Sequence, residues 1–246
     1  MTGLAIIGGT GLRGLDTTRV LRKEILPTPY GQTSGPVITG TLAGREIIFL
    51  PRHGDPHAVP PHKVNYRANI RALKDCGINR IISINAVGGI TRKMTPCSVV
   101  LPDQIIDYTW SREQTFSDGN ADTVTHIDFT RPYSESLRNS ISMAAGNLKL
   151  GLISMATYGA TQGPRLETTA EILRMERDGC DIVGMTGMPE AALARELDID
   201  YASISLVVNW AAGKSAEEIT METIQKNLDA GMNDIKKLLQ EVVKII

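Results

Sequence analysis

The sequence of 246 residues has almost no net charge and only three cysteines. Its 26 Lys and Arg against 27 Asp and Glu give a formal charge of −1, which removes any bulk electrostatic argument for binding nucleic acid or an anionic membrane. Cys76, Cys97 and Cys180 form neither a C-x-x-C pair nor an even framework. We interpret them as free thiols, which favours a reducing, cytoplasmic location.

Long apolar runs and metal-ligand clusters are missing as well. No apolar run is long enough to span a bilayer, and the N-terminus lacks a basic stretch followed by an apolar core, so we expect neither a membrane partner nor a targeting segment. His53, His57 and His62 are close in sequence, but no acidic or cysteine cluster joins them, and we expect no metal ion. Repeats and linkers are also missing, so we expect one domain spanning residues 1–246.

Apolar segments of strand length alternate with amphipathic segments of helix length, which predicts an α/β fold. Strands are expected at residues 4–7, 37–42, 46–50, 80–89, 99–101, 105–106, 151–158, 182–183 and 201–208. Helices are expected at residues 64–76, 134–148, 168–179 and 189–197, and a last one runs to Ile246 from a cap at either Ser215 or Thr220. Residues 109–131 are polar and predict a long surface excursion that carries His126.

A glycine-rich turn, Gly8-Gly9-Thr10-Gly11, follows the first predicted strand. Backbone N–H groups that converge at such a turn can hold a phosphate. The glycine spacing also fits some dinucleotide-binding turns, but that alternative requires a helix and then a strand ending in an acidic residue about 20 positions on. The chain instead runs into residues 26–31, which read as a loop, so a nucleotide cofactor is disfavoured.

The predicted strand at 46–50 leads directly into Pro51-Arg52-His53-Gly54. A guanidinium fork can bind two oxygens at once, and together with an imidazole it suits a phosphate group. The alternative is an exposed basic loop. Because Thr10 also follows a strand, the anion-binding interpretation is favoured.

A second strand-to-helix corner lies at residues 181–190. Gly184 allows close approach of a ligand, Pro189 favours a first helical turn, and Glu190 favours the positive end of that helix. Thr186 would present its hydroxyl near free N–H groups, as anion-binding corners do. The alternative is a strand that simply turns, with Thr186 as an ordinary N-cap.

Two further strand ends carry an Asn, and a loop carries a carboxylate. Asn85 precedes Gly88 and Gly89, which are either a flexible floor or plain turn residues. Asn209 ends the strand at 201–208 and can offer a donor and an acceptor to a planar ligand. Glu167 lies just outside a capping box formed by residues 168–171, where it either points into a cleft or stabilises the helix dipole.

In this order, these residues resemble the trimeric purine nucleoside phosphorylase and methylthioadenosine phosphorylase family, over essentially the whole chain. Six motifs in register carry the resemblance: Ile6-Ile7-Gly8-Gly9-Thr10-Gly11, Arg52-His53-Gly54, Asn65-Tyr66-Arg67-Ala68-Asn69, Asn85-Ala86-Val87-Gly88, Gly163-Pro164-Arg165, and Gly184-Met185-Thr186 with Pro189-Glu190. It implies a single-domain α/β fold with a mixed central sheet flanked by helices.

The resemblance also implies a site, with inorganic phosphate as co-substrate and no cofactor. Phosphate would be held by Thr10, Arg52, His53, Asn85, Ala86 and Thr186. The nucleoside would contact Met185, Leu166, Glu167, Asn209, Ala211, Met221, Ile224 and His126. Asn209, Thr186 and His53 would be catalytic, and His126 would reach across to a neighbour in a homotrimer. Asn85 departs from the hydroxyl residue common in the methylthioadenosine branch, although a carboxamide can still donate to phosphate.

The resemblance further implies a 5′-methylthio 6-oxopurine nucleoside as substrate. The adenine-specific branch has aspartates where this chain has Asn209 and Ala211, and the oxopurine branch has a glutamate where it has Glu167. A histidine usually meets the 5′-hydroxyl in oxopurine phosphorylases, whereas this chain has Met221 and Ile224, three residues apart on one helical face. The expected products are hypoxanthine and 5-methylthioribose 1-phosphate.

Several other functions stay open at this stage. Within the family, the chain could cleave methylthioadenosine or act generally on inosine and guanosine. A hydrolytic nucleosidase on the same fold would not need a phosphate pocket. A nucleotide-binding dehydrogenase or regulatory module is the remotest alternative, and the missing acidic partner of the first glycine turn argues against it.

Overall fold

The computed structural model describes residues 3–9, 19–117, 119 and 124–246. Its strands are β1 (Leu4–Gly8), β2 (Arg19–Glu24), β3 (Pro27–Thr28), β4 (Gly31–Gln32), β5 (Val37–Leu42), β6 (Arg45–Pro51), β7 (Arg80–Gly89), β8 (Val99–Val100), β9 (Gln104–Asp107), β10 (Leu152–Ile153), β11 (Thr157–Ala160), β12 (Ile182–Gly184) and β13 (Asp200–Trp210). Its α-helices are α1 (Tyr66–Asp75), α2 (Glu135–Asn147), α3 (Thr169–Arg177), α4 (Glu190–Glu196) and α5 (Met221–Ile245), and a 3₁₀ turn covers Pro61–Lys63.

One large mixed sheet organises these elements. Strands β6, β1, β7 and β13 run parallel in that order, while β5 and β2 add antiparallel strands beyond β6. Strand β12 runs antiparallel to β7, and β11 links it to β9. The predicted α/β fold with a mixed central sheet is thereby confirmed. The carboxyl ends of β1, β6, β7 and β13 meet at one edge of the sheet, which is where open α/β sheets bind ligands.

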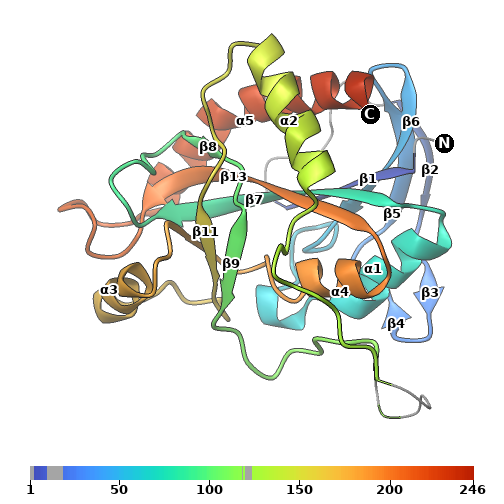
Figure 1. The fold of residues 1–246 in the computed structure, drawn as a ribbon, viewed down its shortest axis with the longest axis horizontal. Coiled ribbons are helices and arrows are strands. Elements are labelled where there is room, and N and C mark those ends of the chain that lie inside the picture. The colour runs from blue at the N-terminus through green and yellow to red at the C-terminus, as the bar shows by residue number, and fades with distance from the viewer. Residues whose placement is uncertain (1–2, 10–18, 118, 120–123) are drawn as a thin grey trace.

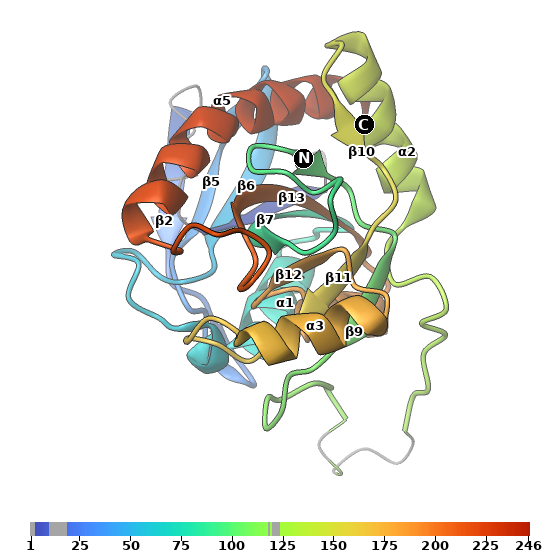
Figure 2. The same ribbon diagram turned by 90° about the vertical axis from the view of Figure 1, so that its left-hand side faces the viewer.

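Helices cover both faces of this sheet. Helices α2 and α5 lie across one face, and α1 and α4 lie across the other (Figure 1). Strand β1 explains the two-sided burial, because its alternate residues point to opposite faces. Leu4 and Ile6 pack in the core below α2 and α5, whereas Ala5 and Ile7 pack in the core on the α1 and α4 side. Helix α3 closes a smaller core beside β11 and β12 (Figure 2). None of the helices in the described ranges is both long and apolar enough to cross a membrane.

The sequence predicted most elements, with some differences. The strand expected at 151–158 is interrupted, because the backbone N–H of Ala156 donates to the Asp103 carboxylate and its carbonyl accepts from the Asp103 N–H. In the helix expected at 168–179, Ile172 and Met175 are buried, while their neighbour Leu173 is 44% exposed. Of the two possible caps of the last helix, Thr220 is the one used.

The region before β5 is more regular than expected. Strand β2 was not predicted, because its charged residues mask the apolar alternation of an edge strand. Residues 26–31, expected as a loop, contribute to the short hairpin of β3 and β4. Strand β2 ends at the acidic residue Glu24, but it runs antiparallel to β5 at the edge of the sheet and does not pair with β1. It is therefore not the parallel acid-tipped strand beside β1 that a dinucleotide-binding unit requires.

The close approach of Gly89 to a neighbouring turn gives a stability prediction. A Cβ on Gly89 would lie 1.9 Å from the Met94 carbonyl oxygen, so Gly89→Ala should lower the free energy of unfolding by about 1–3 kcal/mol or more. Gly146 in α2 has no heavy atom within 4 Å of such a Cβ, so the control Gly146→Ala should raise it by about 0.4–1 kcal/mol. Denaturant unfolding measures both, and equal effects would contradict the packing described.

Candidate active site

A pocket of about 440 Å³ opens at the edge where the parallel strands end. It brings together nearly all the residues that the sequence singled out: Arg52, His53, Asn85, Ala86, Leu166, Glu167, Met185, Thr186, Asn209, Ala211, Met221 and Ile224. Thr10 lies outside the described residues, although its neighbour Gly9 lines the pocket. His126 is exposed on the excursion after β9 and does not line the pocket of its own chain.

Arg52 is a buried cation paired with a buried carboxylate. Its side chain is 1% exposed and that of Glu190 is 0% exposed. Arg52 Nε and Nη2 donate to the two Glu190 carboxylate oxygens at 2.6 and 2.8 Å, in bidentate geometry. Nη2 also donates to Ser83 Oγ at 2.6 Å, and the Tyr201 hydroxyl donates to Glu190 at 2.9 Å. Burial alone would lower the pKa of Arg52, but the Glu190 carboxylate more than offsets it and the pKa stays above its usual value.

This pairing corrects two expectations. The guanidinium fork, expected to bind two phosphate oxygens, is occupied by Glu190, and Glu190 is a buried ion-pair partner and not merely a favourable charge at a helix end. Among the described residues, Nη1 makes only a 3.4 Å hydrogen bond with the Ile84 carbonyl. Nη1 is therefore the donor of Arg52 that a ligand can still engage.

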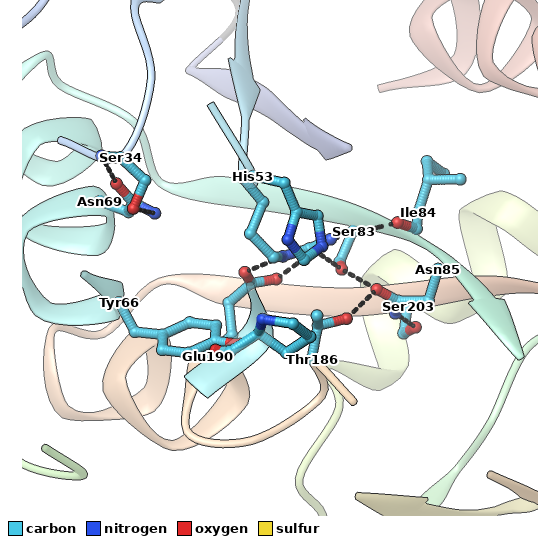
Figure 3. A network of polar contacts seen from close by, with 12 residues as sticks. Ser34, His53, Tyr66, Asn69, Ser83, Ile84, Asn85, Thr186, Glu190 and Ser203 are labelled. Atoms are coloured by element: carbon cyan, nitrogen blue, oxygen red, sulfur yellow. Dashed lines mark hydrogen bonds and ion pairs between the residues drawn. The ribbon is translucent and has the colours of Figure 1, made fainter. Parts of the chain in front are cut away.

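Thr186 and Asn85 form the second polar group of the site. Thr186 Oγ1 donates to Asn85 Oδ1 at 2.8 Å, and Asn85 Nδ2 donates to Ser203 Oγ at 2.7 Å (Figure 3). Helix α4 has Pro189 at its N-cap position with no side-chain cap, which excludes the alternative in which Thr186 is an ordinary cap. Because both side chains are buried and mutually bonded, their polar atoms are held in fixed positions at the pocket wall.

His53 follows Arg52 and is neutral near pH 7. Its Nδ1 lies 2.8 Å from the Val59 carbonyl oxygen, which can only accept, so Nδ1 carries the hydrogen and Nε2 carries a lone pair. Burial first, and then the positive charge of Arg52, lower the pKa of His53 to about 4. The rings of His53 and His57 lie 4.4 Å apart, and both residues line the pocket.

A β-bulge in β13 presents Asn209. Val207 pairs with Val87 and Asn209 pairs with Gly88, so Val208 is an extra residue in the β13–β7 ladder. Bulges of this kind redirect a side chain next to an active site. Asn209 Nδ2 donates to the Trp210 carbonyl at 2.7 Å, which fixes the carboxamide orientation. Ala211 follows as a buried pocket residue.

Glu167 enters the pocket from the loop before α3. Its Oε1 accepts a 2.6 Å hydrogen bond from Thr161 Oγ1, so the carboxylate is tied to the end of β11 as well as to its own loop. Its neighbour Leu166 is 45% exposed at the pocket rim. The same loop contacts Met185, since a Cβ on Gly163 would lie 2.5 Å from Met185 Sδ. The capping box formed by residues 168–171 is present as predicted.

The start of α5 supplies the apolar wall of the pocket. Met221 and Ile224 both line it, together with Ile219, Leu228 and Met232. Met221 is 76% exposed, so this wall is open in the single chain.

Sequence reasoning missed several residues that hold the site. Ser83 and Ser203 lie within apolar strands and carry no local motif, and the partner of Arg52 is 138 residues away in sequence. The sequence could have indicated a cationic partner for Glu190, because a carboxylate that directly follows a buried corner is stable there only when it is paired. Nothing local pointed to Thr161 as the partner of Glu167.

Comparisons with known proteins agree with this geometry. Residues 4–244 match the family model described as "Phosphorylase superfamily". The chain therefore belongs to the phosphorylase superfamily, which confirms the resemblance inferred from the sequence motifs. It is an enzyme of the pentosyltransferase class.

Named relatives and a solved structure show which members of the superfamily the chain is similar to. It is 50% identical over 242 residues to a "Probable S-methyl-5'-thioinosine phosphorylase" of Xanthomonas campestris pv. campestris, covering 98% of this chain and 97% of the relative. It is 42% identical over 251 residues to the "6-oxopurine nucleoside phosphorylase" of Pyrococcus furiosus, covering 100% of this chain and 94% of the relative. The structure of methylthioadenosine phosphorylase from Schistosoma mansoni in complex with adenine superposes with a TM-score of 0.92 at 30% identity, over 98% of this chain and 90% of the other.

The buried pair of Arg52 and Glu190 predicts a large stability effect. Glu190→Ala should lower the free energy of unfolding by about 3–5 kcal/mol, because it leaves Arg52 as an uncompensated buried charge. The double variant Arg52→Met, Glu190→Leu should regain much of that loss. The control Glu135→Ala, which breaks the exposed pair of Glu135 and Arg131, should cost less than about 1 kcal/mol. Denaturant unfolding would contradict the account if the two single variants were equally stable.

The lowered pKa of His53 predicts a pH effect on stability. Between pH 6.5 and about 4 the unfolded chain binds a proton at His53 that the folded chain does not. Stability from this group is therefore complete above pH 6.5 and falls as the pH drops toward 4. Unfolding free energies of the wild type and of His53→Gln, measured from pH 7 to pH 4.5, should diverge, with the wild type losing more. Parallel curves would show that His53 titrates normally.

Proposed function

We propose that the enzyme cleaves S-methyl-5′-thioinosine with inorganic phosphate, giving hypoxanthine and 5-methylthioribose 1-phosphate in purine salvage. The observation that carries the proposal is a single pocket with three kinds of wall. Arg52 and Thr186 supply a cation and a hydroxyl, Glu167 and Asn209 line the same pocket as polar partners for a base, and the start of α5 supplies an apolar wall. The names of the relatives of this chain support the same substrate class.

Phosphate is proposed to bind beside Arg52 Nη1, Thr186, Asn85, Ala86 and His53, with Thr10 as a further predicted contact. The Thr186 hydroxyl would rotate its hydrogen from Asn85 to a phosphate oxygen. The neutral Nε2 of His53 would accept a phosphate proton, or would become a donor once the nearby dianion raises its pKa. No cofactor is proposed, since phosphate itself supplies both the nucleophile and the negative charge.

The reaction proposed is a displacement at the anomeric carbon. The bond from that carbon to the purine nitrogen breaks, and a bond to a phosphate oxygen forms, through an oxocarbenium-like sugar of the kind known for glycosyl transfer. Phosphate held below the ring supplies proximity and stabilises the positive charge. Asn209 would hydrogen-bond the departing purine, which takes up the proton given up by the attacking hydrogen phosphate and leaves as neutral hypoxanthine. Met185 would pack against the ribose.

The match between hydrogen-bond donors and acceptors supports a 6-oxopurine base. Such a base offers N1–H as a donor and O6 as an acceptor, which suits the Glu167 carboxylate and an amide N–H of Asn209. A 6-aminopurine reverses both, and buried unpaired groups can then give discrimination of about 10⁴–10⁵. Ala211 and Leu166 would complete the base pocket without adding charge.

A substrate panel tests the proposal and its alternatives. S-methyl-5′-thioinosine, methylthioadenosine, inosine and adenosine are compared by kcat/KM with phosphate and without it. The proposal predicts strict phosphate dependence and the highest efficiency for S-methyl-5′-thioinosine. Equal efficiency on the adenine nucleosides would overturn the base assignment, and turnover without phosphate would indicate a hydrolytic nucleosidase.

The apolar wall predicts how the 5′ preference can be changed. Once the proposed neighbouring subunit covers this wall, a 5′-hydroxyl beside Met221 and Ile224 would be buried without a partner at a cost of about 1–3 kcal/mol, while a buried methyl contributes about 0.8 kcal/mol. The wild type should therefore prefer S-methyl-5′-thioinosine over inosine by about 20- to 600-fold in kcat/KM. Met221→His should shift the ratio of the two kcat/KM values toward inosine, with Met221→Leu as the apolar control. An unchanged ratio in Met221→His would remove Met221 from the 5′ pocket.

A homotrimer in the cytoplasm is part of the same proposal. The exposure of Met221 and Leu166 at the pocket rim supports a neighbouring subunit that completes it, with His126 reaching across. Three cysteines without a disulfide support a reducing compartment. Light scattering tests the trimer, cell fractionation tests the compartment, and His126→Ala should raise the KM for the nucleoside if His126 completes a neighbouring pocket.

A further inference from the structure

Arg112 lies in the surface excursion after β9 and is hydrogen-bonded to the loops around the active site. In the turn that presents it, the Thr109 N–H donates to the Asp107 carboxylate at 2.8 Å, and Ser111 has a left-handed φ of 50°. The Trp110 N–H donates to Gln162 Oε1 at 3.2 Å, which joins this turn to the loop after β11.

Every nitrogen of the Arg112 guanidinium donates hydrogen bonds. Nη1 donates to the carbonyls of Met185 at 2.9 Å and Met188 at 2.6 Å, and Nη2 donates to those of Thr161 at 3.0 Å and Gln162 at 2.8 Å. Nε donates to Gln162 Oε1 at 3.1 Å. The guanidinium also lies over the Tyr66 ring, 5.5 Å from its centroid, and Nη1 reaches the Tyr66 hydroxyl at 3.3 Å. A planar fork with five N–H groups can do this, and a lysine cannot.

The carbonyls that Arg112 binds belong to the two corners that carry the pocket. Met185 and Met188 flank Thr186, at the proposed phosphate end. Thr161 donates its hydroxyl to Glu167, at the proposed base end. Carbonyl oxygens directed at Arg112 are not directed into a pocket that receives an anion. One side chain therefore fixes the phosphate corner relative to the base corner, without lining the pocket itself.

We propose that Arg112 is a positioning residue that sets the separation between the Thr186 corner and the Glu167 loop, so that phosphate and nucleoside meet in reacting geometry. This inference rests on the proposed function. Arg112 does not line the pocket, so it is assigned no direct contact with either substrate. Its effect comes from the alignment of two loops, in which an error of about 1 Å can cost about 100-fold in rate.

Arg138 provides a matched control. It also donates to main-chain carbonyls, with Nε 3.2 Å from the Pro102 oxygen and Nη2 bonded to the Ser154 oxygen, but these lie away from the pocket lining. Arg112→Lys should lower kcat/KM for both co-substrates by about 100-fold, whereas Arg138→Lys should stay within about 2-fold of the wild type. Both variants lose hydrogen bonds to main-chain carbonyls. If the role of Arg112 were purely structural, the two substitutions would lower the melting temperature to a similar extent and leave kcat/KM of the folded enzyme unchanged.

Two further measurements separate positioning from folding. Added guanidinium ion, at a concentration that leaves the wild type folded, should restore part of the kcat of Arg112→Ala and none of that lost in Thr186→Ala. If Arg112→Lys is unfolded, Gln162→Leu decides, because it removes the side-chain acceptor of both Arg112 Nε and the Trp110 N–H while Arg112 itself remains. It should lower kcat/KM by about 5-fold or more, the equivalent of one to two hydrogen bonds.

The outcomes are distinguishable. An Arg112→Lys variant as active as the wild type, or an unfolded one accompanied by a fully active Gln162→Leu, would overturn the positioning role and leave the proposed function intact. Phosphate-independent cleavage by the wild type would instead overturn the proposed function.

Discussion

The buried pair of Arg52 and Glu190 is the interaction on which the site depends. A charge removed from water is costly unless it is paired and hydrogen-bonded, and this pair meets that requirement with two short bonds and support from Ser83 and Tyr201. The same bonds fix the plane of the guanidinium. Glu190 thus determines which N–H group of Arg52 remains for a ligand, and the pair connects the end of β6 to the start of α4.

The remaining walls follow from how neighbouring strands end. Parallel β1, β6, β7 and β13 bring their last residues to one edge, and the bulge at Val208 redirects the end of β13 so that Asn209 lines the pocket. Helix α5 begins beside this edge and supplies apolar side chains, while the loops after β11 and β12 are tied together through Arg112. The position of the side chains at each pocket wall thus depends on a bulge or a loop, and these take their positions only in the assembled sheet.

The sequence alone was sufficient to predict those parts of the site that depend on residues close together in the chain. Apolar runs that end in glycine predicted β1, β7 and β12, and residue type at the strand ends predicted Arg52, Asn85, Thr186 and Asn209 as pocket residues. The charged edge strand β2 was missed, because its pattern resembles a polar connection.

Pairings between distant residues could not be predicted. Neither the ion pair of Arg52 with Glu190 nor the hydrogen bond from Thr186 to Asn85 has a periodicity or spacing that reveals it. The bulge at Val208 is a property of the β13–β7 ladder and has no signature in either strand alone. The same reason accounts for Arg112, whose partners are main-chain carbonyls of residues with no common motif.

The central claim is that phosphate, held by groups that Glu190 and Asn85 orient, attacks the sugar directly. The most direct test is ³¹P NMR of the wild-type enzyme with S-methyl-5′-thioinosine and one equivalent of inorganic phosphate. The account predicts that the inorganic phosphate signal decreases as a sugar 1-phosphate monoester signal appears, in step with release of hypoxanthine. Release of hypoxanthine with an unchanged inorganic phosphate signal would contradict it.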